Sequence, residues 1–113
     1  MPKELEIKAK DAKPGMTFIP IKKHDKIFLE NKQMLTTVDL MWEIIKSTPA
    51  GGADYEIMAP RMKVWNVLET LHPDSTVVEL PANDFAAFGK LALSFKFKVV
   101  DKFVFEFLHQ FKQ

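Results

Sequence analysis

Phenylalanine is concentrated at the C-terminal end of the chain, where eight of the ten phenylalanines lie within residues 85–113. Side chains of this size bury large apolar areas, so their placement constrains any fold that the chain adopts. These side chains form most of the hydrophobic core of the domain, a docking surface for another molecule, or both. The eight residues are Phe85, Phe88, Phe95, Phe97, Phe103, Phe105, Phe107 and Phe111.

The length of 113 residues suits one domain, and a hydrophobic fraction of 47% is enough for a single core. We expect a basic N-terminal arm or edge strand over residues 1–13 and one globular domain over residues 14–113. Cysteine is absent, which excludes thiolate metal sites, cysteine redox chemistry and a disulfide framework. No stretch resembles a signal peptide or a membrane span, so the expected location is the cytoplasm.

Charge is distributed unevenly although the net charge is only +1. Lysine and arginine outnumber acids in residues 1–32 and 85–113, whereas acids outnumber bases in residues 33–84. The acidic middle either forms the solvated faces of helices or pairs with the basic ends, within the fold or between subunits. We favour solvated faces, because exposed charge pairs contribute little to stability.

The N-terminal half predicts a hairpin followed by a helix. Two short β-prone runs, 16–21 and 27–30, flank a polar segment that reads as the hairpin tip. Pro20 would confine its strand to an edge, since proline cannot donate a ladder hydrogen bond. Thr36 or Thr37 then caps a helix whose apolar positions recur at helical spacing and which ends at residues 49–52.

The middle of the chain predicts a second helix and an extended segment. Asp54 is a plausible cap for a short turn at 55–58, and the main helix is expected to start near Pro60, because proline is favoured at the first helical position. His72 and the following Pro73 end that helix. Residues 76–80 are expected to be extended.

The aromatic C-terminal segment predicts two helices, 84–95 and 102–112, capped by Asp84 and Asp101 and joined by an extended stretch at 97–100. A strand or hairpin over residues 91–107 remains an alternative, because apolar and polar residues also alternate there. The fold class is therefore α+β: a mainly helical single domain with an N-terminal β-hairpin and about four helical segments.

Recognisable catalytic and cofactor motifs are absent. The serines lack a nucleophile-elbow context, and the two adjacent glycines, 51 and 52, are not followed by the residues of a phosphate-binding loop. His24, His72 and His109 have no metal-ligand spacing; His24 falls in the predicted turn. We predict no enzyme activity, no cofactor, no metal and no small-molecule substrate. A small enzyme without a recognisable motif is the third-ranked alternative.

Lysines alternate with phenylalanines over residues 95–103, a pattern in which lysine can contact phosphate while aromatic rings stack on bases. The alternative hypothesis is therefore a nucleic-acid-associated regulator. Arginine, which makes the commonest specific base contact, occurs only at position 61. A basic aromatic helix at a membrane surface is less favoured, since Asp101 and Glu106 interrupt it.

The favoured hypothesis is that the aromatic segment forms a protein-binding surface. In a helix, Phe103, Phe107 and Phe111 share one face that the core can explain. Phe97 and Phe105 fit no such stripe, and exposed aromatic residues mark interfaces. The predicted partner-binding residues are Phe97, Lys98, Lys102 and Phe105.

Three segments carry a resemblance: Asp-Tyr-Glu-Ile-Met-x-x-Arg-Met-Lys-Val-Trp-x-Val-Leu-Glu at 54–69, Val-Glu-Leu-x-x-x-Asp-Phe at 78–85, and Val-Val-Asp-x-x-x-x-Glu-Phe-Leu at 99–108. Over about half of its length the chain resembles small uncharacterised accessory proteins of tailed phages and prophages. Pro60 departs from the uninterrupted helix expected of them.

The resemblance implies a viral accessory protein for assembly or host interaction, located in the host cytoplasm or on the virion. It implies no site residues. Together with the aromatic segment, it predicts a non-enzymatic protein–protein interaction module that binds a partner protein or forms a homo-oligomer.

Overall fold

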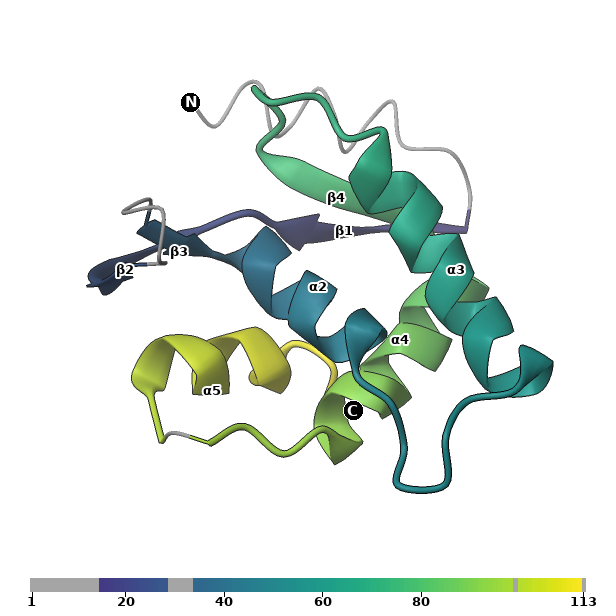
Figure 1. The fold of residues 1–113 in the computed structure, drawn as a ribbon. Helices are drawn as coiled ribbons and strands as arrows, with labels where there is room; N and C mark the ends of the chain where they lie inside the picture. The colour runs from purple at the N-terminus through teal and green to yellow at the C-terminus, as the bar shows by residue number, and fades with distance from the viewer. Residues whose placement is uncertain (1–14, 29–33, 99, 113) are drawn as a thin grey trace.

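The computed structural model describes residues 15–28, 34–98 and 100–112 (Figure 1). The predicted arm over residues 1–13 lies outside this part. The described residues form four strands and four helices, which confirms the predicted α+β class. In chain order the elements are β1 (Met16–Pro20), β2 (Lys23–Phe28), β3 (Met34–Thr36), α2 (Thr37–Lys46), α3 (Tyr55–Glu69), β4 (Val77–Pro81), α4 (Ala82–Ser94) and α5 (Lys102–His109).

Strand β1 pairs antiparallel with β4, with Met16 opposite Pro81 and Pro20 opposite Val77. The prediction that the 16–21 segment forms a hairpin with the next β-prone run is therefore wrong. The nonlocal pairing is favoured by burial: Ile19 on β1 lies opposite Val78 on β4, and both side chains are fully buried. If β1 had paired with the next strand instead, Val78 on β4 would have lacked this buried partner.

The N-terminal hairpin exists, but it is built from β2 and β3, which pair antiparallel with an irregular register. The polar segment expected at the hairpin tip, residues 22–26, instead supplies Lys22 and the first four residues of β2. Its position is set by Lys22, whose carbonyl accepts a 2.9 Å hydrogen bond from Thr37 N and whose N–H donates to Thr37 Oγ1 at 2.9 Å. These bonds hold the chain at the start of α2, so β2 runs outward from there.

Helix α2 begins as predicted, with Thr36 as its N-cap. The Thr36 hydroxyl accepts from Asp39 N at 3.4 Å, and the Asp39 carboxylate accepts from Thr36 N at 2.8 Å, which completes a capping box. The helix buries Met41 and Ile44 against the rest of the fold. Local sequence signals therefore determine both where this helix starts and which face it buries.

Helix α3 runs without a break from Tyr55 to Glu69, so the prediction of a short turn followed by a helix from Pro60 is wrong. Asp54 caps the helix by accepting a 3.0 Å hydrogen bond from Ile57 N. Proline lacks an N–H and removes one bond of the helical ladder. The cap before it, and the burial of Val64 and Leu68 after it, hold the two halves in one helix.

The two C-terminal helices are confirmed, with one corrected cap. Asp84 is not the N-cap of α4, because the helix begins two residues earlier, directly after Pro81 at the end of β4. Asp84 lies in the first turn, and its carboxylate is 3.7 Å from Lys63 Nζ on α3. Asp101 caps α5 as predicted. Residues 91–94 and 102–109 are helical, so the alternative strand over 91–107 does not form.

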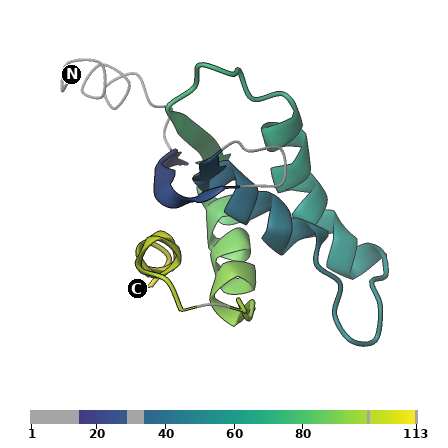
Figure 2. The same cartoon turned by 60° about the vertical axis from the view of Figure 1, so that its left-hand side comes forward.

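Helices α3 and α5 lie on opposite sides of α4, and Figure 2 shows α5 nearly end-on beside it. Aromatic side chains join the end of the chain to α4: the ring of Phe111, which follows α5, lies 5.4 Å from Phe88 and 5.2 Å from Phe85 between ring centroids. Phe107 lies 5.3 Å from Phe111 in an edge-on contact. Most of the phenylalanine concentration at the C-terminus is therefore core.

Candidate protein-binding surface

Phe105 projects from α5 into solvent, with 65% of its surface exposed. The opposite side of the helix carries Val104 and Phe107, which are buried in the core. Successive helical residues are about 100° apart, so when α5 turns Val104 and Phe107 toward the core, Phe105 points away from that face. The Phe105 ring stacks on the His109 ring with 5.8 Å between centroids and 28° between planes. The helix therefore presents an aromatic projection to solvent.

Phe97 has a different environment, in the segment that joins α4 to α5. Its ring makes an edge-on contact with Phe95, with centroids 4.7 Å apart, and it packs partly buried against the core. The next residue, Lys98, is exposed. Both residues line a hollow of about 370 Å³, which we call the Phe97 hollow. Its apolar walls are Leu35, Leu40, Phe95, Phe97 and Val104, and its charged lining residues are Glu43, Lys96 and Lys98.

Lys102 lines a second hollow, of about 540 Å³, on another side of α5. Lys22, between β1 and β2, and Lys23, at the start of β2, contribute to it, and Glu106 contributes from α5. The structure thus brings Phe97 and Lys98 together in one hollow and places Lys102 in another. Phe105 lines neither hollow. The residue before it, Val104, lines the Phe97 hollow.

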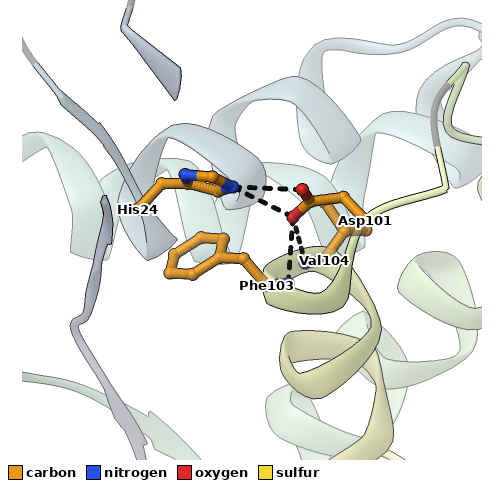
Figure 3. Close-up of polar contacts among 4 residues, drawn as sticks. All are labelled: His24, Asp101, Phe103 and Val104. Atoms are coloured by element: carbon orange, nitrogen blue, oxygen red, sulfur yellow. Dashed lines mark hydrogen bonds and ion pairs between the residues drawn. The ribbon is translucent and has the colours of Figure 1, made fainter. Parts of the chain in front are cut away.

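A histidine–carboxylate pair ties the hairpin to the start of α5 (Figure 3). His24 lies on β2 and is buried, not in the turn that the sequence suggests. Its Nε2 lies 3.1 and 3.2 Å from the two oxygens of Asp101. An ionised carboxylate only accepts hydrogen bonds, so the imidazole donates. The Phe103 ring packs against the imidazole, with 5.2 Å between centroids.

Asp101 also accepts hydrogen bonds from the backbone N–H groups of Phe103 at 2.9 Å and Val104 at 3.3 Å. The hydrogen bond from His24 is the main cause that lowers the pKa of the Asp101 carboxyl below its ordinary 3.8. The two backbone N–H groups lower it further, while partial desolvation acts in the opposite direction. This arrangement positions α5, and hence Phe105, relative to the hairpin.

The lowered pKa of Asp101 predicts an acid-dependent loss of stability. Because the carboxyl has a lower pKa in the folded chain than in the unfolded chain, its ionised form favours folding. This contribution is complete above pH 3.8 and is lost as the pH falls through the lowered folded value. Urea unfolding across this range should show a stability difference between wild type and Asp101→Asn that shrinks toward acid.

A matched NMR titration identifies the cause of the shift. In wild type the Asp101 carboxyl should titrate below pH 3.8, and His24→Leu, which removes the hydrogen-bond donor, should raise its pKa toward that value. An Asp101 carboxyl that titrates at or above its ordinary value in wild type would contradict the assignment.

Helix α3 carries an exposed apolar stripe that the sequence reading missed. Tyr55, Met58 and Met62 are 80%, 47% and 40% exposed. They recur at the i, i+3, i+7 spacing of one helical face. That spacing is visible in the sequence and indicates an apolar helical face. The opposite face carries Val64 and Leu68, so the helix has apolar residues on two sides, and the sequence pattern does not show which side is exposed. The assumed helix start at Pro60 also excluded two of the three residues.

The lysine–phenylalanine segment does not form a flat stacking surface. Phe95, Phe97 and Phe103 are all partly buried and packed against the core. Lys96 and Lys98 line the Phe97 hollow, whereas Lys102 lines the other one. Base stacking needs exposed ring faces, so this arrangement gives little support to the hypothesis of a nucleic-acid-associated regulator.

Within residues 15–28, 34–98 and 100–112, no group of three or more histidine, aspartate or glutamate side chains is placed to hold a metal ion. No helix in the same ranges is both long and apolar enough to cross a bilayer. Comparison of the chain with protein-family models, curated proteins and solved structures finds no match.

Proposed function

We propose that the protein is a non-enzymatic protein–protein interaction module that binds its partner through the surface around α5. The observation that carries this proposal is Phe105, a large aromatic residue that is 65% exposed on a helix whose other side is core. Folding gains little from an aromatic side chain in that position, whereas binding can gain much, because buried aromatic residues dominate interface energetics.

The surroundings of Phe105 also resemble an interface. Lys102 and Glu106 are exposed on the same solvent side of α5, so charged groups surround the aromatic projection. A central apolar anchor with a polar rim is the usual anatomy of a protein interface. The Phe97 hollow adds an apolar depression beside the same helix. An accessory role in phage assembly or host interaction is the setting that we propose for this module.

Photo-cross-linking tests the proposal directly. A photoreactive phenylalanine analogue at position 105, introduced in the cells that make the protein, should give a discrete protein adduct of defined mass. The same analogue at Ala86, an exposed position on α4, is the matched control and should not give it. Excess wild-type protein should compete the adduct away, whereas Phe105→Ala protein should not.

Two results would overturn the proposal. One is the same adduct pattern at positions 105 and 86, which would indicate nonspecific contact. The other is an adduct at 105 that nuclease treatment removes, which would favour the nucleic-acid reading.

A further inference from the structure

The Phe97 hollow has the size and lining for an aromatic side chain. Its volume of about 370 Å³ is larger than the engineered cavity of about 150 Å³ that accommodates benzene in another protein. Its walls include Leu40 from α2, Phe97 from the connecting segment and Val104 from α5. An apolar ring that enters it would exchange water for aliphatic and aromatic contacts on several sides.

Charged side chains at the hollow match those around Phe105. Glu43 lies on the α2 side, and Lys96 and Lys98 lie on the connecting segment. On α5, Lys102 precedes Phe105 and Glu106 follows it, so both signs of charge flank the ring, as both signs line the hollow. In the orientation of the second α5 that turns Glu106 toward Lys96 and Lys98, and Lys102 toward Glu43, all of these charges are complementary. Such complementarity selects a partner and a register.

We propose that the partner is a second copy of this chain and that the Phe105 ring of each copy occupies the Phe97 hollow of the other. This inference rests on the proposed function and names its partner. Glu106 of one copy then pairs with Lys96 and Lys98 of the other, and Lys102 pairs with Glu43. The inserted ring and the hollow that receives it lie close together on each copy, because Val104 of α5 lines the hollow and Phe105 is the next residue. A two-fold axis near α5 makes the contact reciprocal and closed, as in most homodimers.

Sedimentation analysis tests the dimer and its aromatic anchor. Wild type should dimerise in a concentration-dependent manner, and Phe105→Ala should weaken dimerisation by about thirtyfold, the effect of losing an interface hot spot. The variant should stay folded, because Phe105 is mostly exposed. The contact should persist when salt is raised, since its centre is apolar and only its rim is screened.

Disulfide trapping tests the geometry. Because the chain has no cysteine, each introduced thiol is unique. One preparation carries Lys98→Cys and a mass tag, another carries Glu106→Cys, and the two are mixed and oxidised. The heterodimer that joins positions 98 and 106 should form faster than either homodimer. Lys90→Cys, on the exposed side of α4, replaces Lys98→Cys in the matched control and should give no such preference.

Charge reversal distinguishes the loss of a direct contact between the two copies from a loss of folding stability. Lys98→Glu and Glu106→Lys should each weaken dimerisation, and the double variant should recover much of the wild-type affinity. A variant that only disturbed folding would not be rescued by the second change.

Each outcome has a distinct consequence. A dimer that Phe105→Ala weakens, but that shows neither the 98–106 cross-link nor charge rescue, overturns the contact proposed here and leaves the proposed function standing. A monomer that nevertheless gives a specific adduct with another protein at position 105 overturns self-association alone. A monomer with no such adduct overturns both. A dimer insensitive to Phe105→Ala overturns the inference outright.

Discussion

Phe88→Ala is expected to lower the free energy of unfolding by about 3–5 kcal/mol, the range for truncating a buried aromatic residue. Phe88 is 1% exposed and belongs to α4, the helix that contacts α2, α3, α5 and both strands of the β1–β4 sheet. Its ring makes edge-on contacts with Phe107 and Phe111, at centroid distances of 6.5 and 5.4 Å. Removing it opens a cavity where the C-terminal aromatic cluster meets the rest of the core.

Urea unfolding followed by tryptophan fluorescence measures this effect. Phe105→Ala, measured at a protein concentration low enough that both variants are monomeric, is the matched control, because it removes the same side chain from a site that is 65% exposed. The control should change stability by no more than about 0.5 kcal/mol, as surface substitutions usually do. Similar losses for the two variants would show that the division of the phenylalanines into core and surface is wrong.

Gly89→Leu should destabilise the protein by about 2–3 kcal/mol through overpacking. Gly89 is buried on α4, and a Cβ atom added there would lie 3.3 Å from both Cβ and Cδ1 of Phe111. Glycine normally weakens a helix interior, so its presence here is explained by this close approach. A leucine side chain would occupy the position of the Phe111 ring and displace the segment that follows α5.

Two measurements check this prediction. Thermal unfolding should show a lower midpoint for Gly89→Leu, whereas Ala86→Leu, at an exposed position of the same helix, should leave it nearly unchanged. Hydrogen exchange should increase over α5 more than over α2, because Phe111 fastens the C-terminal segment to α4. Unchanged exchange in α5 would mean that its position does not depend on the Gly89–Phe111 contact.

Features determined by neighbouring residues could be predicted from the sequence. The cap at Thr36 and the apolar spacing after it defined α2, and Asp101 marked the first turn of α5 because its carboxylate bonds the following N–H groups. The separation of Phe105 from the buried stripe followed from helical geometry alone. These signals act within a few residues and need no knowledge of the tertiary fold.

Features that depend on distant partners could not be predicted. Nothing near Ile19 indicates that its strand pairs with Val78, and nothing near His24 points to Asp101, which is 77 positions away. The local preference of Pro60 predicts a helix start, yet the packing of α3 on its neighbours outweighs one lost hydrogen bond. The Phe97 hollow likewise combines α2, β3 and α5, so no single segment encodes it.

The pairing of β1 with β4 has a consequence for how the chain folds during synthesis. The partners of β1 are some 60 positions later in the sequence, so the strand emerges from the ribosome well before it can pair. At about 5–20 residues per second, the delay is on the order of several seconds. During that interval Phe18 and Ile19 have no partner strand, and nonlocal pairings of this kind also slow the search for the native state. We therefore expect the nascent chain to be most prone to aggregation before residue 81 has emerged.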